Sequence, residues 1–237
     1  MSIKHEVEIQ RAYYAKTARQ YERQHVDEAD EHYLALNIMV GATNFLQVQS
    51  ILDIGSGTGR AVAFIKNSRP EVEVVGIEPV KELREVGYSQ GLSIEELREG
   101  NALALDFNDN SVDLVCEFGV LHHVRTPDVV ISEMLRVARK AIFLSDSNNF
   151  GHGSPFVRFI KQAINAMGLW GIADFIKTRG KGYTVSEGDG LGYSYSVFNN
   201  YCQIRRFCSR IHVFNLSDAE INPYRTASTV ALLGIKR

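Results

Sequence analysis

The feature that most constrains the fold is a regular alternation that begins near residue 50. Short runs rich in isoleucine and valine alternate with stretches of helical spacing. Strands that alternate with helices form parallel sheets with helices on both faces, because each crossover returns the chain to the same edge. The pattern predicts an α/β, doubly wound, Rossmann-like sheet. The core strands are expected at 50–54, 72–78, 93–98, 112–117 and 141–146.

The segments that flank this core predict the rest of a single domain. Apolar runs at 211–216 and 229–235 can pair as an antiparallel hairpin at the sheet edge, giving seven strands with the last one antiparallel. The glycine-rich stretch 151–200 breaks the alternation and is interpreted as a helical cap over the carboxyl ends of the strands, where ligands bind in such sheets. The domain over 1–237 is divided into an N-terminal helical lid (1–47), a ligand-binding core (48–150), the cap (151–200) and a terminal helix with an edge hairpin (201–237).

Composition and charge narrow the class of protein. The 26 basic and 28 acidic residues give a net charge of -2, and this balance disfavours a nucleic-acid partner. Three cysteines without a C-x-x-C pattern predict free thiols in a reducing compartment, and no metal site is expected. There is no secretory signal and no apolar run of about 18 residues, so we expect a cytoplasmic protein without a transmembrane segment.

One part of the cap has an uneven charge and an apolar helix. Residues 152–182 carry five basic residues and one acidic residue, Asp174. This charge is typical of a solvated basic face, and an anionic substrate group is the alternative. The helix expected between Phe156 and Trp170 is interpreted as packing within the cap, with contact to a lipid surface as the alternative.

The segment from Ile51 to Gly59 is the most informative motif. It follows a buried strand, opens a helix, and carries glycines at alternate positions, with Ser56 between the first two. Such glycines let the backbone turn tightly and approach a ligand, and the helix N-terminus offers free N–H donors. A nicotinamide fingerprint requires G-x-G-x-x-G, but here the last position is Arg60. The spacing therefore disfavours an oxidoreductase. The motif residues are Asp53, Gly55, Ser56, Gly57 and Gly59.

Polar residues follow the next strands at the same edge of the predicted sheet. Glu78, with Pro79 after it, ends the second strand about 20 residues after the loop, where an acid can accept both hydroxyls of a ribose. Asn101 and Ala102 follow the third strand, and the Asn101 amide can hydrogen-bond an adenine edge. The fourth strand leads into a third group, which comprises Glu117, Phe118, His122 and His123.

Together these motifs resemble class I methyltransferases that use S-adenosylmethionine (SAM), in their small-molecule, type 11-like branch. Asp53-x-Gly55-x-Gly57-x-Gly59 is similar to the family's first motif, and Glu78 to its ribose acid. Asn101 stands where many members carry Asp. Val120-Leu121-His122-His123 resembles the segment after the fourth strand. The resemblance implies that Tyr14 and Tyr21, from the N-terminal helix, pack over the cofactor.

The resemblance also implies the reaction: in-line transfer of the SAM methyl group to an oxygen or nitrogen atom of a small acceptor, such as a sugar, a glycan intermediate or another secondary metabolite, leaving S-adenosylhomocysteine. His122 and His123 are candidate bases because imidazole titrates near neutrality, and Asp146 ends the fifth strand where acceptors approach. The alternative is a non-catalytic module that binds SAM or a nucleoside. Neither the acceptor nor the oligomeric state, monomer or homodimer, follows from these motifs.

Overall fold

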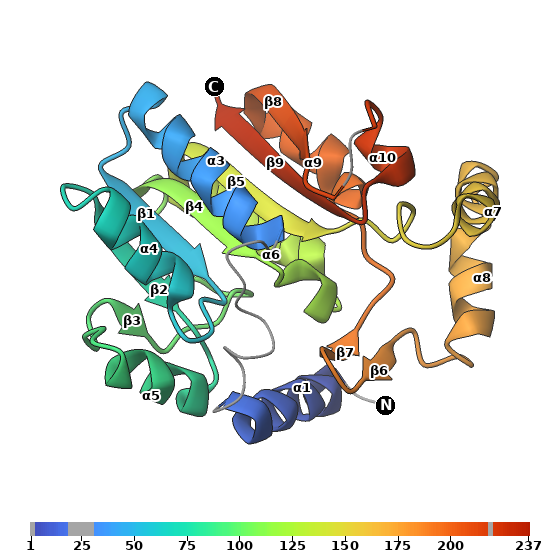
Figure 1. Ribbon diagram of the computed structural model, residues 1–237, viewed down its shortest axis with the longest axis horizontal. Helices are drawn as coiled ribbons and strands as arrows, with labels where there is room; N and C mark the ends of the chain where they lie inside the picture. Colours follow the sequence, from blue (N-terminus) through green and yellow to red (C-terminus); the bar gives the residue numbers. More distant parts are fainter. Residues whose placement is uncertain (1–2, 19–30, 218–219) are drawn as a thin grey trace.

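The computed structural model describes residues 3–18, 31–217 and 220–237, and its centre is a seven-stranded sheet. The strand order is β3-β2-β1-β4-β5-β9-β8 (Figure 1). All seven predicted strands are therefore present in one Rossmann-like sheet. Their bounds are β1 (Ser50–Ile54), β2 (Glu73–Ile77), β3 (Leu97–Arg98), β4 (Val112–Phe118), β5 (Ala138–Ser147), β8 (Cys208–Asn215) and β9 (Thr229–Lys236).

The strand directions create the place where a ligand can bind. Strands β1 to β5 are parallel, and β9 lies antiparallel between β5 and β8. The predicted antiparallel hairpin is confirmed, with its second strand inserted beside β5. The chain runs outward from β1 in both directions, through β2 on one side and β4 on the other. Such a switch point leaves a crevice at the carboxyl ends of the strands.

Helices cover both faces of the sheet and bury two apolar layers. One layer packs α3 (Glu31–Phe45) and α4 (Arg60–Ser68) on the sheet, with Met39, Ile65 and Phe143 at its centre. The other packs α6 (Pro127–Val137) and α9 (Tyr201–Phe207) on the opposite face. Other helices in the described residues are α1 (Ile3–Thr17), α5 (Lys81–Ser89), α10 (Pro223–Thr226) and the short turns η2 (Leu121–His123) and η3 (Val197–Asn200).

The predicted cap divides into two structurally different parts. Helices α7 (Pro155–Ala166) and α8 (Trp170–Lys177) stand beyond the edge of the sheet (Figure 1), and none of their residues is buried among the described parts of the chain. The prediction that this segment packs within a cap was therefore wrong for its apolar side chains. The small hairpin of β6 (Thr184–Ser186) and β7 (Gly190–Gly192) instead contacts α1, and it lies at the strand ends.

Helix α3 exposes part of its apolar surface. Leu34 and Phe45 are 46% and 75% exposed. The buried residues are Ala35, Leu36 and Met39. Apolar residues surround much of this helix, so their spacing alone did not select the buried side.

Two other sequence predictions can be compared with the described residues. Cys116, Cys202 and Cys208 are free thiols. Within the described ranges, the helices are too short or too polar to cross a bilayer.

Candidate active site

A pocket of about 250 Å³ opens at the carboxyl ends of β1, β2 and β4 and extends under α1. It brings together residues that the sequence placed on five separate segments. Those lining it include the predicted site residues Tyr14, Gly55, Gly57, Glu78, Pro79, Asn101, Ala102, Phe118 and His123. Tyr21, the other predicted tyrosine, lies outside the described residues.

The glycine loop between β1 and α4 forms the floor of this pocket. Gly55, Gly57 and Gly59 have φ angles of 67°, 56° and 81°, which L side chains rarely adopt. A Cβ atom on Gly55 would also lie 2.5 Å from Cγ2 of Val120. Helix α4 begins at Arg60, immediately after the loop. The backbone at this turn therefore requires glycine, and only glycine leaves the pocket open.

Glu78 lies against the loop from the end of β2. Its carboxylate accepts hydrogen bonds from the backbone N–H of Gly57 at 3.0 Å and of Val80 at 2.8 Å. Burial raises the pKa of Glu78 to about 6, although those two hydrogen bonds and the Arg84 cation act against the increase. A buried carboxylate that lines the pocket can accept hydroxyl hydrogen bonds from a bound ligand.

Asp53 is buried beside the loop, near the end of β1, and is not part of the pocket lining. Its Oδ2 atom has no hydrogen-bond partner among the described residues, and burial raises the pKa of Asp53 to about 7. An unpartnered buried carboxylate oxygen is costly unless a ligand or water satisfies it. Ser56 and Gly59 also lie outside the lining. The Ser56 hydroxyl donates to the Asp53 carbonyl, and Gly59 packs on Leu92.

Of the predicted site residues Asn101 and Glu117, the first lines the pocket and the second does not. Asn101 lines the pocket, and its Oδ1 atom accepts a hydrogen bond from the Leu103 N–H at 3.0 Å. Its amide nitrogen is therefore the group that can donate to an acceptor nitrogen of a purine. Glu117, the residue before Phe118, is fully buried. Its carboxylate oxygens accept hydrogen bonds from the backbone N–H groups of Val120 and Ser145. Burial, followed by the charge of Asp146, raises the pKa of Glu117 well above its usual value.

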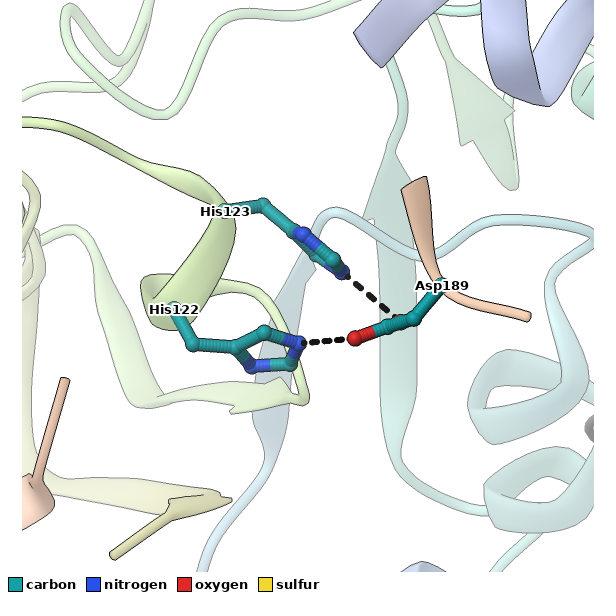
Figure 2. A group of neighbouring side chains, drawn as sticks. All are labelled: His122, His123 and Asp189. Atoms are coloured by element: carbon teal, nitrogen blue, oxygen red, sulfur yellow. Dashed lines mark hydrogen bonds and ion pairs between the residues drawn. The ribbon is translucent and has the colours of Figure 1, made fainter. Parts of the chain in front are cut away.

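The turn η2 places the two candidate bases beside the β6–β7 hairpin (Figure 2). Nε2 of His122 lies 3.3 Å from Oδ2 of Asp189, and Nε2 of His123 lies 3.3 Å from Oδ1 of the same carboxylate. The hydroxyl of Tyr14 is 2.9 Å from Nε2 of His123. His123 lines the pocket, whereas His122 lies behind it.

Asp146 holds His122 from the other side. Its Oδ1 atom lies 2.7 Å from Nδ1 of His122, and its Oδ2 atom accepts the backbone N–H of Leu121 at 2.7 Å. Burial opposes a charged imidazole, but the Asp146 and Asp189 carboxylates outweigh it and raise the pKa of His122 to about 10. Burial also opposes ionisation of Asp146, yet the His122 cation lowers its pKa below the ordinary value. In this state His122 already holds the proton that a general base would have to accept.

Sequence reasoning missed the residues that close the pocket. Asp189 was not singled out, although Gly188 and Gly190 on either side are a signal for a turn that presents an acid. Glu6 of α1 was also missed. It forms a bidentate pair with Arg125, with both N–O distances 2.6 Å, and accepts the Tyr193 hydroxyl at 2.8 Å. These contacts join α1, the loop after η2 and the segment after β7 over one pocket.

Comparisons with known proteins agree with this arrangement. Residues 52–144 match the family model for a methyltransferase domain. A phosphatidylethanolamine N-methyltransferase of Cereibacter sphaeroides is 28% identical over 130 residues, which is 48% of this chain and 57% of that protein. A demethylmenaquinone methyltransferase of Symbiobacterium thermophilum is 29% identical over 162 residues, covering 59% and 63%. The chain thus spans less than two thirds of these relatives' own lengths.

Solved structures resemble the whole fold at low identity. A SAM-dependent methyltransferase from Thermotoga maritima superposes with a TM-score of 0.58 at 17% identity, covering 95% of this chain and 99% of that one. The YcgJ protein from Bacillus subtilis gives a TM-score of 0.55 at 16% identity, covering 87% and 99%.

The sheet, with its glycine loop and the acid Glu78 at the end of the next strand, has the Rossmann-like fold of these solved methyltransferases. Residues 52–144 match a methyltransferase domain, and the fold of the chain is similar to that of solved class I SAM-dependent methyltransferases. The domain match and the methyltransferase names of the relatives do not favour the alternative of a non-catalytic binding module.

Proposed function

We propose that this chain binds SAM in the pocket and transfers its methyl group to an oxygen or nitrogen atom of a small-molecule acceptor. The observation that carries the proposal is the convergence of the glycine loop, Glu78 and Asn101 on one crevice at the switch point of the sheet. Such a crevice is where doubly wound sheets bind nucleosides.

The residues present fit this cofactor. The Glu78 carboxylate suits the two ribose hydroxyls, the Asn101 amide suits a ring nitrogen of adenine, and the orphaned Oδ2 of Asp53 suits an ammonium group or a bound water. Gly55 and Gly57 line the pocket without side chains and leave space for the methionine end. Ser56, Gly59 and Glu117 support the loop and strand ends, and Pro79, Ala102 and Phe118 add apolar surface.

When bound, SAM supplies a methyl group already activated by a positive sulfur, so this chain's residues mainly position the acceptor. Positioning two bound reactants can contribute about 7–11 kcal/mol to lowering a barrier. His123 and Tyr14 present a ring nitrogen and a hydroxyl at the pocket wall, within reach of an acceptor. His122, held protonated between two carboxylates, fixes η2, and Asp146 acts through it as a positioning residue.

Titration calorimetry with SAM, S-adenosylhomocysteine and NAD tests the cofactor assignment. We expect the first two to bind at micromolar concentrations and NAD not to bind. Release of S-adenosylhomocysteine with a panel of sugars, glycan intermediates and amines then tests turnover. Cofactor binding without turnover of any acceptor would favour the non-catalytic module. Preferential NAD binding would overturn the proposal.

A further inference from the structure

His122, His123 and Asp189 form a cluster of potential metal ligands beside the pocket. The two imidazoles come from η2, and the carboxylate comes from the turn between β6 and β7 (Figure 2). One ligand atom from each residue can be chosen so that all three lie within 4.8 Å of one another. The histidine side chains are 17% and 9% exposed and the Asp189 side chain 51%, so solvent can reach the cluster from the hairpin side.

The other nitrogen of each ring is already occupied by an oxygen acceptor. Nδ1 of His122 lies 2.7 Å from Oδ1 of Asp146, and Nδ1 of His123 lies 2.6 Å from the Leu191 carbonyl oxygen. Nε2 of Gln10 also lies 3.1 Å from Nδ1 of His123, but the Leu191 oxygen is closer. Neither oxygen carries a hydrogen, so we assign the proton to both Nδ1 atoms. Both Nε2 atoms are then directed at Asp189. This is how metal-binding histidines are oriented in proteins, with one nitrogen fixed by a carboxylate or carbonyl and the other on the ion.

The distances from the two rings to Asp189 match those between ligands of a shared ion. Each Nε2 atom lies 3.3 Å from a different Asp189 oxygen, just beyond the usual range for N–H···O hydrogen bonds. Two ligand atoms about 2.1 Å from one ion, at angles of about 90–109°, lie about 3.0–3.4 Å apart. The two ring centroids are 3.9 Å apart, so both rings lie side by side at the Asp189 carboxylate (Figure 2).

We propose that His122, His123 and Asp189 bind one divalent first-row transition-metal ion, such as Mn²⁺ or Zn²⁺. Two imidazoles and one carboxylate with open positions are a donor set that such ions favour. The Tyr14 hydroxyl, 2.9 Å from Nε2 of His123, lies where a further ligand or the acceptor would approach. An ion here would bind an acceptor oxygen and lower the pKa of its hydroxyl. That catalytic role rests on the proposed function, whereas ion binding does not.

The test is titration calorimetry of metal-stripped full-length protein with Mn²⁺ and Zn²⁺, together with the visible absorption of the Co²⁺ form. We expect one ion per chain and ligand-field bands without the charge-transfer band of a cobalt–thiolate bond. Asp189→Asn should weaken binding by about 100-fold or more. Asp189 is half exposed, so this variant should fold. Glu187→Gln, an exposed carboxylate in the same hairpin, is the matched control and should bind like the unchanged protein.

Absence of saturable binding by any of the three ions would overturn the metal site. Equal affinity in Asp189→Asn, or a thiolate band from Cys202, would place the ion elsewhere and also overturn it. S-adenosylhomocysteine binding is measured on the same samples. Retained cofactor binding with no ion would reject the metal site while the proposed function stands.

A different observation concerns the exposed surface of α7 and α8. Both helices carry large apolar side chains at positions spaced by three and four, so each presents an apolar face. Phe156 and Phe159 of α7 are 72% and 69% exposed, and Phe175 and Ile176 of α8 are 64% and 70% exposed. Large apolar side chains gathered on exposed helix faces mark a site of interaction.

The positive charge near these two apolar faces indicates what binds to them. Lys177, Arg179 and Lys181 are exposed at the end of α8 and just after it, and residues 152–182 hold five basic residues against one acidic residue. A second copy of the chain would bring the same positive charge to the contact. An anionic lipid surface accepts both the apolar faces and the lysine and arginine side chains. We infer that α7 and α8 dock on such a surface.

Co-sedimentation with phosphatidylcholine vesicles, with and without phosphatidylglycerol, tests this docking. We expect binding mainly to the anionic vesicles, and at least about a tenfold loss in the double variant Phe159→Asp/Phe175→Asp. Phe45→Asp, at a 75% exposed phenylalanine of α3, is the matched control and should bind normally. Absence of binding to anionic vesicles, or self-association that the double variant abolishes, would overturn the inference.

Discussion

The two walls of the pocket are built in different ways. The floor, from the glycine loop to Phe118, comes from the parallel strands β1, β2 and β4 and the loops directly after them. The roof joins α1, the turn η2 and the β6–β7 hairpin, and its contacts span large sequence separations, such as 187 residues between Tyr193 and Glu6.

The difference lies in what holds each wall in place. The floor is part of the buried sheet, with Leu52, Ile54 and Val115 fully or almost fully excluded from solvent. The roof depends on a few polar contacts between segments outside the sheet, so it can open at a much smaller cost in free energy than the floor can. We therefore expect floor substitutions to abolish cofactor binding and roof substitutions to weaken it slightly.

The largest effect should come from Gly57→Val in the floor. Gly57 has a φ of 56° and donates its N–H to Glu78, so a β-branched residue would strain the turn and enter the pocket. Calorimetry should show about a 100-fold or larger loss of S-adenosylhomocysteine affinity, equivalent to about 2.8 kcal/mol. Gly91→Val is the matched control, since Gly91 also has a positive φ of 102° but open space around it. Unchanged affinity in a folded Gly57→Val variant would contradict the expected difference between the floor and the roof of the pocket.

The next effect concerns Glu78, the acid proposed to bind the ribose. Glu78→Ala should weaken S-adenosylhomocysteine binding by about 1–3 kcal/mol, or about 5- to 150-fold, because charged hydrogen bonds to the ligand are lost. Glu99→Gln provides the control. This carboxylate is 78% exposed and pairs with Arg84, which also contacts the Glu78 carbonyl. A loss below a few tenths of a kcal/mol in Glu78→Ala would remove Glu78 from the ligand contacts.

The floor could be predicted from the sequence because its signals are local. A strand, an acid and alternate glycines occupy Ile51 to Gly59, and Glu78 follows the next strand. Strand ends in a parallel sheet must meet at one edge, so the order of the motifs already implied a common site. The same reasoning placed His122 and His123 near the pocket, but their charge state depends on carboxylates elsewhere in the chain.

The roof could not be predicted in the same way. Asp189 lies 67 residues after His122, and no periodic pattern relates two such positions. The exposed faces of α7 and α8 were misread for a related reason. Helical spacing shows that Phe156 and Phe159 share a side, but it does not show whether that side meets protein, solvent or lipid.

The pH dependence of cofactor binding sharpens the assignment of Glu78. Burial raises its pKa to about 6, so the carboxylate becomes protonated below that pH and loses acceptor capacity. Affinity for S-adenosylhomocysteine should fall by up to about tenfold per pH unit below about 6. The sign for stability is opposite. A raised pKa in the folded state means that stability decreases as pH rises from about 4.5 to about 6.

Calorimetry over this range, with Glu78→Gln as the comparison, checks the assignment. The glutamine variant should bind more weakly at neutral pH but lose this dependence. A profile that is the same in both proteins would assign the titration to another group.

The smallest effect should come from the roof. Glu6→Gln removes a charge from the contact that ties α1 to Arg125 and Tyr193, while the 38% exposed Arg125 side chain can regain water. A partly exposed pair contributes about 0.5–1 kcal/mol, so S-adenosylhomocysteine affinity should fall only about two- to fivefold, and α1 should be cleaved faster by trypsin. Glu8→Gln, on the same helix with its side chain 75% exposed, should change neither result. A loss in Glu6→Gln as large as that in Gly57→Val would mean that the roof is as rigidly built as the floor.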